Sequence, residues 1–302
     1  SSAASDVYKR QMYESNPADL CADLFYLVAF PEHKLGKNVL GTRDSVNSMT
    51  PDMLRKHMDR FYSPASTVAC FCGKFERDKI ISLCKRYFSS PANKSVIPAL
   101  PKADFCPGVH IFDKKTEQNQ IVIGFSAPSL GSDSRFACQL IASMLGGSAS
   151  SRLFRRLREE QGLVYSVDAC ASSYLSAGVF AVSMGVSRES EKKAVLTAAE
   201  VLREFPDTVT EEELDLARDH YLSGLIMSLE SNSARAARYG TGELLLGGAI
   251  SEKELEEKIR GVSIDEIRSL ARSFSSLSDA CICAVGRTAG AKFYNKVVSG
   301  KK

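Results

Sequence analysis

The chain has 302 residues, of which 44% are hydrophobic and 25% are charged, and its formal net charge is +3. The 39 basic and 36 acidic side chains are mixed along the sequence, so no concentrated positive patch predicts nucleic-acid binding. No apolar run approaches the length of a membrane span. This length and composition predict a globular protein of two domains.

The N-terminal part of the chain predicts three helices and one strand. Residues 1–11 resemble translated adapter sequence and are predicted to be a non-native tail, so they are left out of the fold prediction. Asn16-Pro17 and Thr50-Pro51 each combine a capping residue with a proline at the first helical position. The predicted elements are helices over 17–30, 51–62 and 76–88 and a strand over 67–72, closed by Gly73.

A proline-rich segment over 93–106 predicts a linker, after which strands and helices alternate irregularly. Pro206 is expected to end one helix, and the capping box formed by Thr210 and Glu213 is expected to start the next. The predicted strands are 109–112, 120–125, 164–171, 179–186 and 280–285, and the predicted helices are 136–145, 151–160, 189–205, one that begins at 210, 233–246 and 264–275. The pattern predicts an α+β fold with a mostly antiparallel sheet and helices on one face.

Two parts of the sequence repeat at an offset of 213 residues. Residues 50–73 align without a gap on residues 263–286, which pairs Phe61 with Phe274 and Cys70 with Cys283. Upstream, Glu14-Ser15-Asn16 matches Glu230-Ser231-Asn232 at an offset of 216. A period this long does not indicate a solenoid. It indicates two related domains in tandem, with chance resemblance between helix–turn–strand units as the alternative.

The first copy is predicted to be incomplete. The second copy begins near Phe105 and has 125 residues before Glu230, whereas only 13 residues precede Glu14. We therefore expect about 112 residues of the first domain to be missing. The predicted domains are the second half of an N-terminal domain over 12–92 and a C-terminal domain over 107–296. A sheet without its leading strands should expose an apolar surface around Val68, Phe71 and the helix that bears Leu24.

Residue types with metal or nucleophile chemistry form no recognisable motif. The four histidines are His33, His57, His110 and His220, and no two of them have the i, i+4 spacing of a helical zinc site. The sequence has no Gly-x-Ser-x-Gly turn, phosphate-binding Gly-x-x-x-x-Gly-Lys loop or Cys-x-x-Cys pair. The cysteine pairs 70/72 and 281/283 occupy equivalent places in the two copies. We interpret them as small core residues, with a redox or metal pair as the alternative.

The most informative segment is a glycine- and serine-rich turn at 146–151, followed by a helix, Gly162 and a strand. Arg158 lies in the last turn of that helix, and Tyr165 lies two residues into the strand. A reversal at Gly162 can bring the guanidinium and the phenol together, where both can donate hydrogen bonds to a carbonyl or a developing oxyanion. The alternative is an arginine stabilised by the dipole at a helix C-terminus and a tyrosine at a sheet edge.

The same segment, Leu-Gly-Gly-x-x-Ser-Ser-Arg-Leu-Phe-x-x-Leu-Arg-Glu-x-x-Gly-Leu-x-Tyr-Ser, resembles the C-terminal domain of the pitrilysin/insulinase-type metallopeptidases. The processing-peptidase-like branch, with two domains per chain, is the more similar one. Matches also occur at Lys115-x-x-Gln118, at Glu212-Glu213-Leu214 and, upstream, at Glu14-Ser15-Asn16-Pro17 and His33-Lys34-Leu35-Gly36. The resemblance covers residues 12 to about 290, and implies two homologous domains of the processing-peptidase metallohydrolase fold.

The resemblance implies a zinc-dependent mechanism whose metal site this chain lacks. The N-terminal domain of the family carries an inverted motif, H-x-x-E-H, whose glutamate acts as general base for a zinc-bound water. A further metal-binding glutamate stands five residues before the position of Glu14, where this chain has Lys9. Zinc is therefore expected in the full-length parent and not in this chain. The carry-over from the family is the pair Arg158 and Tyr165, which binds the substrate carbonyl across the chamber between the domains.

The sequence is interpreted as the C-terminal three quarters of a zinc metalloendopeptidase, inactive by itself and cytoplasmic. Its expected partners are a peptide or unfolded-protein substrate and a second subunit, in a homodimer or a heterodimer with a related chain; no nucleic acid or membrane is expected. One alternative is a non-catalytic partner subunit of a heterodimeric processing-type peptidase. Another is a purely structural interaction protein, in which Arg158 and Tyr165 would not converge.

Overall fold

The computed structural model describes residues 16–88 and 100–300. The predicted tail at 1–11 and the first half of the predicted linker, residues 93–99, lie outside these ranges. The described part of the chain divides into two compact units. The larger unit contains residues up to Gly41, residues Pro101–Tyr221 and residues from Lys258 onwards, and the smaller unit contains residues Thr42–Leu100 and Leu222–Glu257.

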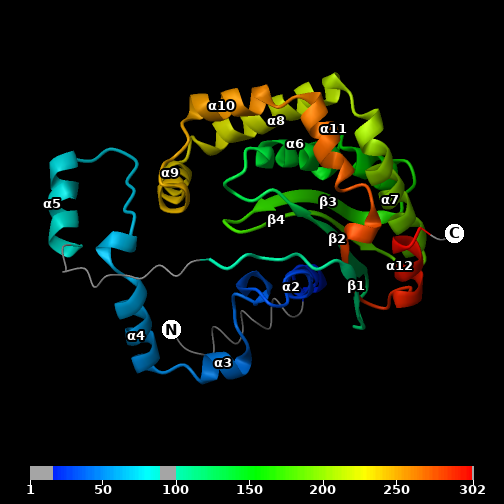
Figure 1. The fold of residues 1–302 in the computed structure, drawn as a ribbon, viewed down its shortest axis with the longest axis horizontal. Coiled ribbons are helices and arrows are strands. Elements are labelled where there is room, and N and C mark those ends of the chain that lie inside the picture. Colours follow the sequence, from blue (N-terminus) through cyan, green and yellow to red (C-terminus); the bar gives the residue numbers. More distant parts are fainter. Residues whose placement is uncertain (1–15, 89–99, 301–302) are drawn as a thin grey trace. The chain divides into compact units, whose positions relative to one another are not determined.

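The larger unit is built on a mixed five-stranded sheet in the order β1-β5-β2-β4-β3 (Figure 1). The strands are β1 (Gly108–Phe112), β2 (Asn119–Ala127), β3 (Val164–Ser173), β4 (Gly178–Val186) and β5 (Cys281–Val285). Only β1 and β5 are parallel, and the other neighbouring strands are antiparallel. The predicted α+β class with a mostly antiparallel sheet is confirmed.

One face of the sheet is covered by helices α6 (Ser134–Gly146) and α11 (Ile264–Arg272), and α7 (Glu191–Thr208) packs beside α11 (Figure 1). Aromatic side chains fill the centre of this layer. Phe274, which follows α11, stacks on Phe180 of β4 at 4.6 Å between ring centroids and lies 5.8 Å from Phe125 of β2. Such ring pairs contribute about 0.5–1.5 kcal/mol beyond the area that they bury.

Helix α2 (Pro17–Ala29) covers part of the opposite face of the same sheet (Figure 1). Its predicted cap is confirmed, because the Asn16 side chain accepts a hydrogen bond from the backbone N–H of Ala18 at 3.1 Å. Phe25 is buried directly against Gly124, where an added Cβ would lie 2.2 Å from the ring. The sequence did not predict a helix on this face, and the expectation that the helix bearing Leu24 would be exposed is wrong.

The smaller unit contains α3 (Arg43–Asn47), α4 (Pro51–Phe61), α5 (Arg77–Tyr87) and α9 (Asn232–Leu246). The predicted strand over 67–72 is wrong: the segment begins extended, with Thr67 at φ −120° and ψ 132°, but it forms no ladder. A strand needs a hydrogen-bonded neighbour, and the described residues offer it none. Instead α9 lies beside it, with the Cys72 thiol 3.6 Å from the amide oxygen of Asn232.

Local geometry repeats between the two copies at the predicted offset. Thr50 and Ser263 both cap a helix by accepting a hydrogen bond from the backbone N–H three residues on. The short 3-10 helices η2 (Pro64–Ser66) and η4 (Leu277–Asp279) follow at equivalent places, and Gly73 and Gly286 share φ values of +134° and +135°. The repeat interpretation is therefore supported by backbone conformation as well as by sequence.

Two helices pack outside the predicted copy to which their residues belong. α2, from the predicted first copy, packs on the sheet of the larger unit, whereas α9, from the predicted second copy, contacts Cys70, Cys72 and Gly73 in the smaller unit. The cysteine interpretation is correct for Cys281 and Cys283, which are buried, and wrong for Cys70, which is exposed.

Three other helices depart from the sequence prediction. α7 continues through Pro206 to Thr208, because a proline so close to a helix C-terminus disrupts only the last turn. α10 (Glu252–Gly261) and α12 (Ala291–Val298) were not predicted. α8 (Glu211–Ser228) begins after the predicted capping box, in which Glu213 N–H donates to Thr210 Oγ1 at 3.3 Å.

No helix in the described ranges is long and apolar enough to cross a membrane.

A fully buried carboxylate attaches the C-terminal helix to the sheet. Glu191, at the N-terminus of α7, accepts hydrogen bonds from the Tyr294 hydroxyl at 2.6 Å, the Asn119 amide at 2.8 Å and the Ala289 backbone N–H at 2.9 Å. Burial, followed by the hydrogen bond to Glu191, raises the pKa of Tyr294 above its usual range. The phenol therefore stays a donor.

Candidate functional site

The glycine- and serine-rich turn leads into a helix with an unusual hydrogen-bond pattern. The helix starts at Arg152 and continues as the π-helix η3 (Phe154–Glu159). Its wider turn is visible in the bond from Glu160 N–H to the Arg155 carbonyl at 2.9 Å, which spans five residues. The side chains of Leu153 and Leu157 are fully buried and hold one face of this helix against the core. π-helical turns are rare and are frequently found at functional sites.

Gly162 reverses the chain between this helix and strand β3. Its φ of +60° lies in the left-handed region, which glycine adopts without a steric penalty. We call the segment from Arg158 through Gly162 to Tyr165 the corner. Two backbone hydrogen bonds close it, from Gly162 N–H to the Arg158 carbonyl at 3.2 Å and from Leu163 N–H to the Leu157 carbonyl at 2.8 Å. The predicted reversal at Gly162 is present.

A β-bulge at the start of β3 sets the direction of Tyr165. Val164 pairs with Val186 and Ser166 pairs with Gly185, so Tyr165 is the extra residue. Tyr165 and Ser166 are both exposed, whereas Val164 and Val167 on either side are buried. The bulge keeps the apolar residues in the core while the tyrosine side chain, 57% exposed, points away from it.

The corner brings Arg158 onto the backbone of Tyr165. The Arg158 guanidinium donates to the Tyr165 carbonyl oxygen, and its carbon lies 5.4 Å from the centre of the Phe154 ring. The structure therefore joins the two predicted site residues through the tyrosine's main chain and not through its phenol. Because a guanidinium carries five N–H donors and both side chains are exposed, each retains donors for a bound carbonyl. The catalytic role of the pair stays a prediction.

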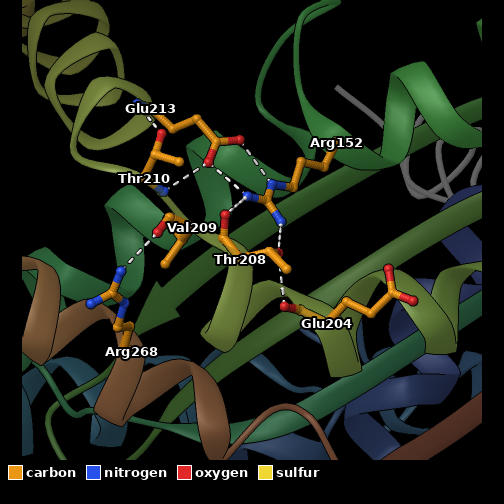
Figure 2. Close-up of polar contacts among 7 residues, drawn as sticks. All are labelled: Arg152, Glu204, Thr208, Val209, Thr210, Glu213 and Arg268. Atoms are coloured by element: carbon orange, nitrogen blue, oxygen red, sulfur yellow. Dashed lines mark hydrogen bonds and ion pairs between the residues drawn. The ribbon is translucent and has the colours of Figure 1, made fainter.

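Arg152, for which no functional role was predicted from the sequence, lies at the centre of a polar network (Figure 2). Its Nε and Nη2 atoms donate to the two carboxylate oxygens of Glu213 at 2.8 and 2.6 Å. Nη1 and Nη2 also donate to the hydroxyl and the carbonyl of Thr208 at 2.5 and 2.8 Å. The guanidinium lies 4.9 Å over the ring of buried Phe205. Arg152 thus ties the start of the helix that ends in η3 to the α7–α8 junction.

The charge of Glu213 depends on this network. Burial opposes ionisation, but the hydrogen bonds from Arg152 and Thr210 outweigh it and hold the pKa of the Glu213 carboxyl below its ordinary value. Thr210 N–H donates to Glu213 at 3.1 Å. A carboxyl with a depressed pKa in the folded state stabilises that state above the unfolded pKa, and this contribution is lost as pH falls through the folded value.

We therefore expect Glu213→Gln to lower the free energy of unfolding at pH 7, and this difference from the unaltered protein to shrink as pH falls below about 4.5, the ordinary pKa. Urea unfolding of the monomeric fraction at several pH values measures it. Glu212→Gln at an exposed neighbouring position is the control. A Glu213→Gln difference that is the same at pH 7 and pH 3.5 would contradict the ionised network.

Three of the four histidines have contacts or a pKa shift that the structure defines. The buried His33 ring accepts a hydrogen bond from Leu35 N–H at 3.1 Å at the start of the 3-10 helix η1 (Lys34–Gly36). His57 lies 4.8 Å from the Phe61 ring, and burial lowers the pKa of His110. Within residues 16–88 and 100–300, no group of three or more His, Cys, Asp or Glu side chains could hold a metal ion.

Comparisons with known proteins agree on one family. The chain is 31% identical over 263 residues to an uncharacterized zinc protease of Bacillus subtilis, covering 87% of this chain and 64% of the relative. It is 29% identical over 271 residues to an uncharacterized zinc protease of Mycobacterium tuberculosis, covering 88% and 62%. The chain thus spans less than two thirds of the length of these relatives.

Solved structures share the fold. A chain of complex III from Candida albicans matches with a TM-score of 0.84 at 17% identity, over 97% of this chain and 74% of that one. A peptidase M16 inactive domain from Pseudomonas fluorescens matches with a TM-score of 0.79 at 18% identity, over 96% and 71%. The family model described as "Peptidase M16 inactive domain" matches residues 48–221, which is more than half of the chain. The chain therefore belongs to the peptidase M16 inactive-domain family.

Proposed function

We propose that this chain is the C-terminal part of a zinc-dependent metalloendopeptidase that cleaves peptides in a chamber between two domains. In this proposal the chain supplies the domain that binds the substrate and the transition state, and the zinc ligands belong to an N-terminal segment outside it. The names of the relatives as zinc proteases support the metal and the reaction class. The observation that supports substrate binding by this domain is the corner, which places Arg158 and Tyr165 next to each other with both side chains exposed.

The proposed substrate is a peptide or unfolded protein, whose scissile carbonyl would accept hydrogen bonds from Arg158 and Tyr165. In the family's pattern, the zinc ion would activate a water molecule, with the glutamate of H-x-x-E-H as general base. This chain's own residues would orient the carbonyl and stabilise the oxyanion that forms when water attacks it. We propose a cytoplasmic location, and a homodimer or a heterodimer with a related subunit as the working assembly.

The alternative is a non-catalytic partner subunit of a heterodimeric processing-type peptidase. The fold likeness to a chain of complex III from Candida albicans favours it, because that chain is part of a multisubunit assembly. Arg158 and Tyr165 do not separate the two proposals, since a partner subunit can keep both residues. The two proposals are separated by whether an assembly that also contains the N-terminal domain cleaves peptides.

The test is a reconstitution with an N-terminal segment of a family member that carries H-x-x-E-H, co-expressed with this chain; we call the product the reconstituted assembly. The chain alone is expected to take up no stoichiometric zinc and to cleave no peptide, whereas the reconstituted assembly gains both properties. Metal analysis and a quenched-peptide assay measure them. One-to-one zinc uptake by the chain alone, abolished by changing any histidine, would refute the proposal. A zinc-loaded assembly without cleavage would favour the partner-subunit alternative.

Unequal burial of equivalent residues supports an incomplete first domain. Leu54 and Met58 on α4 are 55% and 54% exposed, whereas their counterparts at the offset of 213, Ile267 and Ala271 on α11, are 0% and 2% exposed. In the second copy, α6 and α7 pack against α11. An equivalent layer, together with strands beside residues 67–72, would complete the first copy.

We accordingly expect the isolated chain to self-associate through the exposed apolar face of α4 that bears Leu54 and Met58. Leu54→Glu combined with Met58→Lys should raise the monomer fraction in light scattering coupled to size exclusion, because it places charges on the apolar face without changing net charge. Lys56→Glu combined with Asp59→Lys, on exposed polar positions of the same helix, is the matched control and should change little. An unaltered chain that runs as a clean monomer with one cooperative unfolding transition would contradict this expectation.

A further inference from the structure

The helix that carries Arg158 is held at both ends, by two different kinds of contact. At its C-terminal end the Arg158 guanidinium binds the Tyr165 carbonyl across the corner. At its N-terminal end Arg152 uses all three guanidinium nitrogens on Glu213 and Thr208. The two residues lie six positions apart, Arg152 just before the π-helix and Arg158 in its last turn.

π-helical turns are rare, so the conformation of this one depends on the contacts that the surrounding structure makes with it. Buried Leu153 and Leu157 fix which face of the helix meets the core. The planar fork of Arg152 fixes the position of the helix start, since two parallel bonds to one carboxylate define both distance and orientation.

We propose that Arg152 is a positioning residue for the corner, holding the helix in the geometry that presents Arg158 and Tyr165 to a peptide. The presentation to a peptide rests on the function proposed above, whereas the positioning is a property of this chain alone. Arg152 acts through Glu213 and Thr208, which are the acceptors of its hydrogen bonds (Figure 2).

Arg268 provides a matched control, because it binds the same α7–α8 junction without touching the helix. Its Nη2 donates to the Val209 carbonyl at 3.2 Å (Figure 2). A purely structural role for Arg152 predicts that Arg152→Met and Arg268→Met affect the corner equally once their stabilities are matched. A positioning role predicts a local effect of Arg152→Met only.

Amide hydrogen exchange of the folded chain measures the corner directly. The reporters are Gly162 N–H and Leu163 N–H, whose backbone bonds close it. We expect exchange at both amides to be about tenfold faster in Arg152→Met than in Arg268→Met, compared at temperatures equally far below each midpoint, because a charge-assisted anchor is lost. Arg152→Lys should show the same increase, since an ammonium cannot reproduce the fork.

A second measurement uses the absence of tryptophan from the sequence. In a Tyr165→Trp background, acrylamide quenching of the single indole should rise with Arg152→Lys and stay unchanged with Arg268→Met. If Arg152→Met does not fold, Arg152→Lys and Glu213→Gln provide the same comparison. Equal exchange and equal quenching in the Arg152 and Arg268 variants would overturn the proposal.

The reconstituted assembly adds a test of the link to catalysis. Arg152→Lys should lower kcat with little change in KM, and it should cause no further loss in a variant that already carries both Arg158→Ala and Tyr165→Phe. Additive losses would overturn the positioning role. If the unaltered assembly cleaves nothing, the proposed function fails, and the exchange and quenching results still decide the positioning role.

Discussion

Replacing Arg158 by alanine in the reconstituted assembly is expected to lower kcat on the order of 100-fold, because one donor to a developing oxyanion is lost. Tyr165→Phe should have an effect of similar size, since it removes the hydroxyl while keeping the ring and the bulge at this position. Zinc content should be unchanged in both variants; the thermal midpoint should be unchanged in Tyr165→Phe and should fall only slightly in Arg158→Ala, which loses an exposed hydrogen bond to the Tyr165 carbonyl. Steady-state kinetics, metal analysis and thermal unfolding on the same preparations measure the three quantities.

The alternative interpretation of this pair predicts the opposite result. An arginine that only complements the helix dipole and a tyrosine that only ends a sheet edge would cost a few tenths of a kcal/mol to about 1 kcal/mol in stability and nothing in turnover. Arg156→Ala, at an exposed position on the same helix, controls for a general loss of positive charge. Normal turnover in both Arg158→Ala and Tyr165→Phe would retire the functional assignment.

Glu191→Ala is expected to cause the largest loss of stability in the larger unit, about 3–5 kcal/mol. The change removes an acceptor shared by Asn119, Ala289 and Tyr294, and it leaves the buried Tyr294 hydroxyl without this hydrogen bond. The C-terminal helix α12, which carries Tyr294, should detach first. Urea unfolding followed by circular dichroism measures the global loss, and hydrogen exchange in α12 measures the local one.

Two further variants measure how much of the stability lost in Glu191→Ala is due to the hydrogen bonds that Glu191 accepts. Tyr294→Phe removes one hydrogen bond and should cost about 1–2 kcal/mol, because Glu191 keeps its other donors. Glu189→Ala, on the exposed side of the turn before α7, should stay within about 0.5 kcal/mol of the unaltered protein. A Glu191→Ala loss no larger than that of Glu189→Ala would show that the network contributes little.

The features predicted correctly from the sequence are those encoded by neighbouring residues. Caps at Asn16, Thr50 and Thr210, and the strand and helix periods of the second copy, depend on local hydrogen bonds and on which side chains alternate. The reversal at Gly162 is of the same kind, since only the residue's own backbone freedom is required. These interactions are short in sequence, and so the pattern of residue types is sufficient to indicate them.

The features missed depend on tertiary contacts. The bulge at Tyr165 is a register shift of β3 against β4, and a register shift leaves no periodic signal in the sequence. The residues 67–72 have strand-forming side chains but no partner strand among the described residues. The hydrogen bonds of Arg152 were likewise not predicted, because its partners Glu213 and Thr208 are about 60 residues away in sequence.

The most direct test of the central claim is to ask what part of a bound peptide lies against Tyr165. A photocrosslinking phenylalanine derivative at position 165, in a reconstituted assembly stripped of zinc so that the peptide stays intact, captures its nearest neighbours for mass spectrometry. The same derivative at exposed Leu216 on α8 is the control. We predict crosslinks from position 165 to the residues that flank the scissile bond, and none of these from position 216. Crosslinks from position 165 only to the ends of the peptide, or equal capture at both positions, would contradict the claim.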